Sequence, residues 1–216
     1  MKAVFLDYTG TILQIGGPDM EEMIGRVVKN SSFSDPKEAV KWWFSNLGRL
    51  EEEAYRETYV NEEELCLSLL ERLSREKGLK DDLRQIQQLN INFWMYGTLF
   101  SDVRPFFEQC GLPLYILTNN SSEYVRICLR RNGLHVNDII SADDVKAYKP
   151  HAEIFNKALE VSGCAPEDVM QITDSVSDAE GAAACGIASV VLDRKHELSE
   201  TKFRTVGNLK EAMRWL

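Results

Sequence analysis

The chain has 216 residues, 44% of them hydrophobic, and a formal net charge of −9 at pH 7. It is long enough for one large α/β domain or for a core with a smaller inserted domain. The negative charge and the lack of a basic stripe argue against nucleic-acid binding, and no apolar run approaches the roughly 20 residues that span a bilayer. Five widely spaced cysteines without a CxxC pair are typical of a reduced, cytoplasmic protein.

The first functional signal lies near the N-terminus. Residues 2–6 form an apolar run with β-branched and aromatic members, which predicts a buried strand that ends at Asp7. A carboxylate after a central parallel strand lies at the sheet edge where open α/β sheets bind ligands. Gly10 then permits a tight turn, and Thr11 adds a hydroxyl close to it.

Helix signals replace strand signals after the Gly16-Gly17-Pro18 linker. Apolar spacing predicts four helices, the second and third with Asp35 and Asn61 as N-caps, at residues 20–29, 35–47, 61–78 and 82–94. Gly48 is expected to interrupt the second of them. We interpret the four helices as an all-helical module inserted after the first strand and its turn.

Two features of this insert are interpreted as structural. The aromatic run Trp42-Trp43-Phe44 is interpreted as packing within the insert rather than as a substrate platform. The acidic runs that begin at Glu51 and Glu62 are interpreted as solvated helix faces.

Strands alternate with helices from Leu99 onward. Apolar runs predict strands at residues 113–117, 139–140, 169–172 and 188–192, with helices between and after them. This alternation predicts a parallel sheet with right-handed crossovers. The expected fold is therefore α/β, a Rossmann-like core of residues 1–15 and 97–216 with an inserted all-helical cap domain of residues 16–96.

Three of the predicted core strands end in a residue capable of chemistry, namely Asp7, Thr118 and Asp174. Because the strands are parallel, their ends lie at the same edge of the sheet. Lys149 lies in a loop that leads into a helix on that side, and Asp178 follows Asp174 by four residues. The sequence therefore predicts that these five residues form one site.

These residues also carry four short motifs, and with them the chain resembles the haloacid dehalogenase superfamily over nearly its whole length. Members of this superfamily are mostly phosphohydrolases. The helical insert between the first and second motifs fits the helical cap of the superfamily. The motifs are Asp7-Tyr8-Thr9-Gly10-Thr11, Leu117-Thr118-Asn119, Lys149-Pro150, and Thr173-Asp174-Ser175-Val176-Ser177-Asp178 with Gly181.

The resemblance implies a role for each side chain of the site. Asp7 is implied to be the nucleophile, which forms an aspartyl-phosphate. Thr9 is implied to occupy a catalytic position of the superfamily. Thr118 and Asn119 are implied to bind the substrate. Lys149 is implied to neutralise and position both Asp7 and the phosphate.

A metal site is expected among the same residues. The resemblance implies that Asp7, the backbone carbonyl of Thr9, Asp174 and Asp178 hold the ion. The charges agree, because three carboxylates and a phosphate with only Lys149 against them need a divalent cation. Mg²⁺ is the expected ion, since it prefers carboxylate, water and phosphate oxygens.

Thr9 is where the chain departs from the phosphatases of the superfamily. They carry a second Asp there, which protonates the leaving group and later activates water, and Thr9 does neither at neutral pH. The first motif also resembles that of P-type ATPases, but no membrane span is expected. The haloacid dehalogenases proper carry Tyr at this place and need no metal, and the retained Asp174 and Asp178 pair argues against them.

The sequence thus predicts a Mg²⁺-dependent hydrolase that acts on a small phosphorylated metabolite through Asp7. Two alternatives remain open. One is carbon–phosphorus bond hydrolysis like that of phosphonoacetaldehyde hydrolases, which also lack the second Asp and use a cap lysine, here Lys29 or Lys41. The other is a non-catalytic protein that binds a phosphoryl ligand. Neither the substrate nor the oligomeric state follows from the sequence.

Overall fold

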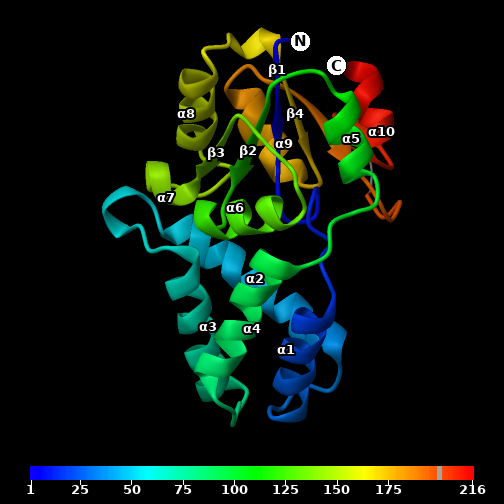
Figure 1. The fold of residues 1–216 in the computed structure, drawn as a ribbon. Helices are drawn as coiled ribbons and strands as arrows, with labels where there is room; N and C mark the ends of the chain where they lie inside the picture. The colour runs from blue at the N-terminus through cyan, green and yellow to red at the C-terminus, as the bar shows by residue number, and fades with distance from the viewer. Residues whose placement is uncertain (199–200) are drawn as a thin grey trace.

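The core of the protein is a sheet of parallel strands. The computed structural model describes residues 1–198 and 201–216, and within them six strands pair in the order β3-β2-β1-β4-β5-β6 (Figure 1). The predicted α/β class is confirmed, but β6 escaped prediction because its three residues are too few for a hydrophobic period. The strands are β1 (Ala3–Leu6), β2 (Leu114–Thr118), β3 (Asp138–Ser141), β4 (Val169–Thr173), β5 (Ala188–Leu192) and β6 (Arg204–Val206).

Helices cover both faces of this sheet. One face packs against α8 (Ala152–Ser162) and α9 (Val176–Ala184). The other packs against α5 (Val103–Gln109), α6 (Ser122–Arg131) and α10 (Leu209–Ala212). Side chains of β1 alternate between the two layers, which explains its continuous apolar run. The short helices are α7 (Ala142–Val145) and the 3₁₀ turns η1 (Arg56–Thr58), η2 (Pro166–Asp168) and η3 (Met213–Trp215).

The residues between β1 and α5 form an all-helical cap below the core in Figure 1. The predicted N-caps of its second and third helices are confirmed. Asp35 accepts hydrogen bonds from the amides of Lys37 and Glu38, and Asn61 accepts one from the amide of Glu64. The boundaries of the cap as a separate domain, residues 16–96, stay a prediction. Its helices are α1 (Pro18–Lys29), α2 (Pro36–Glu53), α3 (Glu62–Glu76) and α4 (Leu83–Tyr96).

Two expectations about the cap are wrong. Helix α2 is not interrupted at Gly48 but continues to Glu53. A glycine costs a helix about 1 kcal/mol, and the buried Trp43 and Leu47 on the same helix offset that cost. The acidic runs are not entirely solvated either, because Glu62 is buried and Glu51 is half-buried.

The cap also touches the core away from its two covalent connections. Residues 54–61, between α2 and α3, run along the loop that precedes α8. The Tyr148 hydroxyl donates a hydrogen bond to the carbonyl oxygen of Val60 at 2.7 Å, and the Tyr59 hydroxyl donates one to Asp143, also at 2.7 Å. These contacts hold the cap over the carboxyl ends of the strands.

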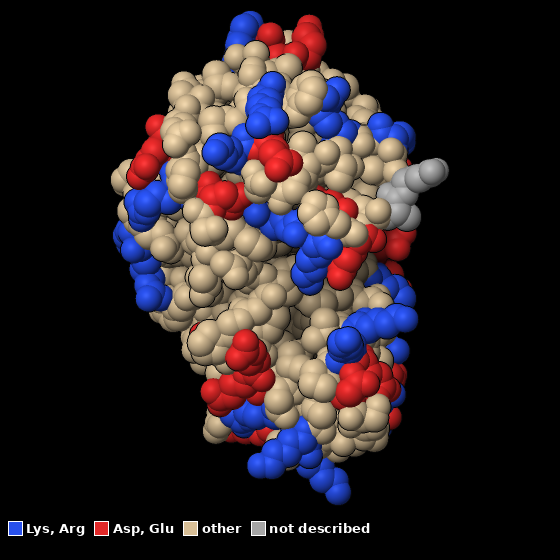
Figure 2. All heavy atoms as spheres, turned by 90° about the vertical axis from the view of Figure 1, so that its right-hand side faces the viewer, with Lys and Arg blue, Asp and Glu red and all other residues tan. Residues whose placement is uncertain are grey.

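On the face shown in Figure 2, Lys and Arg side chains are interspersed with Asp and Glu over both the core and the cap. In the part of the chain that the structure describes, no helix is both long enough and apolar enough to cross a bilayer.

Candidate active site

Three neighbouring strands bring the predicted site residues together. Asp7 follows β1, Thr118 ends β2 and Asp174 follows β4, and β1 lies between β2 and β4 in the sheet. The backbone amide of Asp7 still pairs with the carbonyl oxygen of Ile172 at 3.0 Å, so the carboxylate leaves the sheet at a fixed point. All seven predicted residues line one cavity of about 520 Å³ between core and cap, namely Asp7, Thr9, Thr118, Asn119, Lys149, Asp174 and Asp178.

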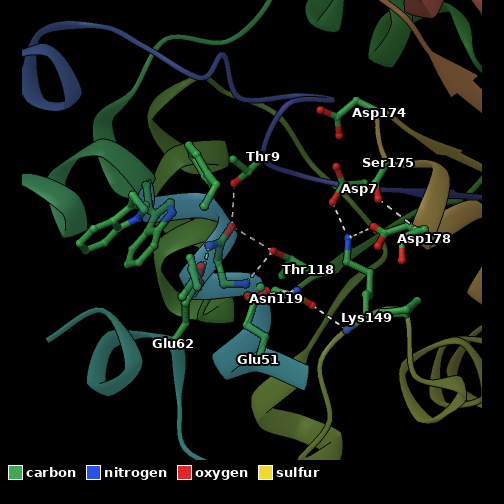
Figure 3. A pocket seen from close by; sticks show the side chains of 18 of the residues that line it. Asp7, Thr9, Glu51, Glu62, Thr118, Asn119, Lys149, Asp174, Ser175 and Asp178 are labelled. Carbon is green, nitrogen blue, oxygen red and sulfur yellow. Dashed lines mark hydrogen bonds and ion pairs between the residues drawn. The ribbon is translucent and has the colours of Figure 1, made fainter. Parts of the chain in front are cut away.

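Lys149 links two of the carboxylates. Its ammonium lies 2.5 Å from Oδ1 of Asp7 and 2.7 Å from Oδ2 of Asp178, and Figure 3 shows it between the two carboxylates. All three side chains are buried. Burial disfavours the charged ammonium, but the charges of Asp178 and Asp7 outweigh it and raise the pKa of Lys149 above its ordinary value. Lys149 therefore stays protonated and orients the Asp7 carboxylate.

Local structure fixes Asp178 and Lys149, two of the three residues of this ion-pair cluster. Ser175 is the N-cap of α9, and its hydroxyl accepts a hydrogen bond from the amide of Asp178 at 3.2 Å. Gly181 on the same helix lets the loop that carries Lys149 come close, since a Cβ there would lie 2.4 Å from the carbonyl oxygen of Pro150. The Asn119 side-chain oxygen accepts a hydrogen bond from the amide of Lys149 at 2.8 Å.

The turn after Asp7 is equally constrained. Gly10 adopts a φ of +92°, and a Cβ at this position would lie only 2.0 Å from a carboxylate oxygen of Asp174. The Thr11 hydroxyl accepts a hydrogen bond from the amide of Asp174 at 2.9 Å. Behind the turn, Arg194 donates to the carbonyl oxygen of Thr11 at 2.8 Å and pairs with Asp102 at 3.0 Å. Only glycine allows this close approach of the first and fourth motifs.

Asp174 and Asp178 are electrostatically different from an exposed aspartate. Burial raises the pKa of Asp174 well above its ordinary value, and the nearby Asp7 carboxylate raises it further. Burial also raises the pKa of Asp178, against the opposing charge of Lys149. A single ammonium therefore faces the buried carboxylates of Asp7 and Asp178 and the half-buried one of Asp174, which favours a proton on one of them.

The cap contributes two further carboxylates, which the sequence interpretation missed. Figure 3 shows Glu51 and Glu62 reaching the pocket from the cap, across from Asp174. Glu62 accepts a hydrogen bond from the Asn120 amide at 2.5 Å, and Glu51 accepts one from the Asn119 amide at 3.2 Å. Neither forms an ion pair within the described residues.

Both cap carboxylates bind protons more tightly than exposed ones. Burial raises the pKa of Glu62 to about 7, with a further rise from the charge of Asp143. Burial and the charge of Glu62 raise the pKa of Glu51 well above its ordinary value. At neutral pH the cap therefore brings a partly ionised Glu62 to the cavity, next to Glu51, whose pKa is also raised.

Thr9 connects the two sides of the cavity. Its hydroxyl donates a hydrogen bond to Oδ1 of Asn120 at 2.8 Å, while Thr118 donates to the same oxygen at 3.2 Å. The amide group of Asn120 then donates to Glu62. The hydroxyl of Thr9 is thus occupied as a donor, and it positions Asn120.

The remaining wall of the cavity is apolar and comes from the cap. Trp43 and Leu47 of α2 and Phe93 of α4 are buried side chains that line it. The aromatic run of α2 therefore both packs the cap and faces the cavity. An apolar wall excludes water and strengthens the electrostatic interactions of the charges opposite it.

The residues expected to hold Mg²⁺ do not fit an ion. Lys149 lies between Asp7 and Asp178, where a cation shared by the two carboxylates would lie. Across residues 1–198 and 201–216, no group of three or more His, Cys, Asp or Glu side chains is arranged to hold a metal. The Lys149 ammonium and a proton bound to one of the carboxylates reduce the excess negative charge from which the metal was predicted.

A parallel sheet with a carboxylate after its central strand and a helical cap over that carboxylate defines a capped α/β protein with its candidate site between core and cap. The model of haloacid dehalogenase-like hydrolases matches residues 1–186, and the chain belongs to this family.

Curated relatives of this chain are of two kinds. The (S)-2-haloacid dehalogenase of Pseudomonas putida is 25% identical over 167 residues, 73% of this chain and 73% of that enzyme. The phosphoglycolate phosphatase of Escherichia coli (strain K12) is 32% identical, but only over 102 residues, 46% of this chain and 40% of that enzyme. The similarity to the dehalogenase thus extends over more of the molecule.

The solved structures agree on the fold. The L-2-haloacid dehalogenase of Xanthobacter autotrophicus with chloropropionic acid covalently bound has a TM-score of 0.80 and 17% identity. The match covers 99% of this chain and 97% of that one. It therefore includes the cap as well as the core, which confirms the α/β core with an inserted helical cap.

These findings correct the functional expectation. A Mg²⁺-dependent phosphohydrolase is wrong, because curated relatives that match most of the chain are haloacid dehalogenases. Carbon–phosphorus hydrolysis and non-catalytic phosphoryl binding are wrong for the same reason. The argument from Asp174 and Asp178 failed because Lys149 pairs with Asp178 and needs no metal to do so. The individual roles predicted for the site residues stay predictions.

Proposed function

We propose that this hydrolase cleaves the carbon–halogen bond of a small halogenated organic acid through an ester on Asp7. A carboxylate oxygen of Asp7 attacks the carbon that bears the halogen, and the halide leaves with the bonding electron pair. Water then adds to Cγ of the Asp7 ester and releases a hydroxy acid. The sum is organic halide plus water giving hydroxy acid, halide and a proton.

Thr9 is the observation that carries this proposal. A phosphate monoester needs a proton on its leaving alcohol, and the hydroxyl of Thr9 is already donated to Asn120. A halide is a stable anion that leaves without a proton. Thr9 therefore leaves a phosphatase of this kind without its proton donor, whereas a dehalogenase needs no proton donor for its leaving group.

The surroundings of Asp7 suit a nucleophile. Its side chain is buried, with Lys149 against one oxygen. One ion pair holds the carboxylate in place, while the apolar wall of Trp43, Leu47 and Phe93 keeps water from solvating the attacking oxygen. The names of the relatives, with a covalently bound chloropropionic acid in one of them, support the same chemistry.

Halide release tests the proposal. We expect the protein to release chloride from one enantiomer of 2-chloropropionate with formation of lactate, and to do so equally well in EDTA. Asp7→Asn removes the nucleophile and should reduce turnover by about 10⁴-fold or more.

The path of the oxygen atom is a second measurement. In a single turnover in ¹⁸O-water with enzyme in excess, the label should enter the Asp7 carboxylate and not the lactate, because water attacks Cγ. Label that appears directly in lactate would contradict the ester. No chloride release from halogenated acids of two to six carbons would contradict the function itself.

A further inference from the structure

Hydrolysis of an Asp7 ester needs a base, and each titratable side chain of the described core that lines the cavity interacts with another side chain. Asp178 is paired with Lys149 at 2.7 Å. Asp174 lies beside Asp7, and burial and the Asp7 carboxylate raise its pKa. The imidazole of His151 lines the cavity but stacks on the Tyr55 ring, with 4.4 Å between the ring centres.

Resting on the proposed function, we propose that Glu62 of the cap accepts the proton of the water that hydrolyses the Asp7 ester. Glu62 is a catalytic residue in this scheme, and Asn120 and Thr9 are positioning residues. The base thus comes from α3, a different part of the fold from the nucleophile.

Geometry supports this role. Glu62 is buried, lines the cavity, and is held by one hydrogen bond from Asn120 to Oε2. Asn120 is held in turn by Thr9, two residues after the nucleophile, and by Thr118. A buried carboxylate without a cation is costly, and its retention at the substrate cavity is explained if it transfers protons there.

The electrostatic environment agrees. Burial raises the pKa of Glu62 to about 7, which suits a group that gains and loses a proton at neutral pH. Burial and the charge of Glu62 raise the pKa of the neighbouring Glu51 as well. The other titratable groups that act on Glu62 or feel its charge are Tyr59, Cys66, Asp143, Tyr148 and Lys149.

The proton balance of the step is complete. Water oxygen bonds to Cγ of the ester while one water proton passes to Glu62. When the tetrahedral intermediate collapses, the bond between Cγ and the substrate oxygen breaks, and Glu62 returns the proton to the departing alkoxide. Asp7 is left as a carboxylic acid and loses its proton to solvent.

Glu62→Gln separates the two half-reactions. Glutamine keeps an oxygen that accepts the Asn120 hydrogen bond but cannot accept the proton. On rapid mixing with 2-chloropropionate, we expect one chloride per site at the wild-type rate, followed by turnover slowed roughly 10²–10⁴-fold. The protein mass should rise by one 1-carboxyethyl group, esterified to Asp7, which peptide mapping locates.

Three variants complete the experiment. Glu64→Gln removes an exposed carboxylate from the same helical turn and should behave like wild type. Glu62→Asp keeps a carboxylate and should recover part of the hydrolysis rate, which also guards against misfolding of the glutamine variant. Asp174→Asn tests the competing core carboxylate. The wild-type hydrolysis rate should rise with pH through about 7, and Glu62→Gln should lose this dependence.

The possible outcomes are distinct. If the wild type releases no halide, the proposed function fails and the inference fails with it. If the wild type turns over but Glu62→Gln accumulates no ester, or keeps the wild-type pH profile, the inference alone is overturned. Ester accumulation in Asp174→Asn and not in Glu62→Gln would assign the base to the core.

Discussion

The core side and the cap side of the cavity stabilise their carboxylates in different ways. On the core side, Lys149 pairs with Asp7 and Asp178, and the N-cap residue of α9 orders the second carboxylate. On the cap side, Glu51 and Glu62 accept hydrogen bonds from asparagine amides but form no ion pair within the described residues. The core side is held by opposite charges, and the cap side is held by neutral donors.

This difference separates orientation from proton transfer. An ion pair fixes the position of a carboxylate, which suits a nucleophile that must be oriented toward the carbon it attacks. A buried carboxylate with only amide donors gains and loses a proton near pH 7, as the raised pKa of Glu62 indicates. The two sides therefore suit the two half-reactions, attack by Asp7 and hydrolysis of its ester.

Removing the ammonium of the core should have the largest effect. Lys149→Met leaves Asp7 and Asp178 buried without their cation, which typically costs about 3–5 kcal/mol of unfolding free energy. The cost should shrink at low pH, because the carboxylates then take up protons. Urea denaturation at pH 7 and pH 4 measures both effects.

Lys2→Met is the matched control for this variant. Lys2 pairs with Asp168 at 2.7 Å, the same distance as Lys149 to Asp178, but its side chain is 70% exposed. Exposed pairs contribute little, so stability should hardly change. Equal losses of unfolding free energy in the two variants would contradict the expectation that the buried ion pairs of Lys149 contribute more than the exposed pair of Lys2.

The cap side should respond to pH in the opposite sense. The pKa of Glu62 rises from 4.5 to about 7 on folding, so the folded protein binds this proton more tightly than the unfolded chain. The contribution of Glu62 to the unfolding free energy is therefore fully present below pH 4.5. It is lost as the pH rises from 4.5 through about 7, a change of about 3 kcal/mol.

The measurement compares Glu62→Gln with wild type by denaturation from pH 4 to pH 8. The variant should gain relative stability as pH rises from 4.5 to 7, and then the difference should level off. Glu64→Gln, exposed on the same turn, is the control for loss of one negative charge. A flat difference for Glu62→Gln would show that its carboxylate is well solvated.

The same contrast explains what could be predicted from the sequence. Asp7, Thr118 and Asp174 were found because chemistry at the ends of parallel strands follows from strand order alone. Lys149 followed from its motif. The topology brings them together whatever the cap does, so the core half of the site is encoded in short local patterns.

Glu51 and Glu62 had no such pattern. Glu62 follows the N-cap Asn61, a place where acidic residues usually lie in solvent and favour the helix dipole. Only the docking of the cap buries it, and that depends on tertiary contacts such as Tyr148 with Val60. The expected Mg²⁺ failed for a related reason, because counting charges does not show that Lys149 lies between two of the carboxylates.

Thr9→Val should have the smallest effect, and it tests the link between the two sides. Valine has nearly the shape of threonine but no hydroxyl, so Asn120 loses one donor and keeps the hydrogen bond from Thr118. One such hydrogen bond contributes about 1 kcal/mol. Because halide leaves without a proton, the burst of chloride in rapid mixing should keep its rate, while ester hydrolysis slows by less than about tenfold through looser positioning of Asn120 and Glu62. The two rates are resolved in one experiment, from the burst and from the steady state. A burst slowed by 100-fold or more would mean that the Thr9 hydroxyl assists the leaving group, and Thr9 would then no longer favour a dehalogenase over a phosphatase.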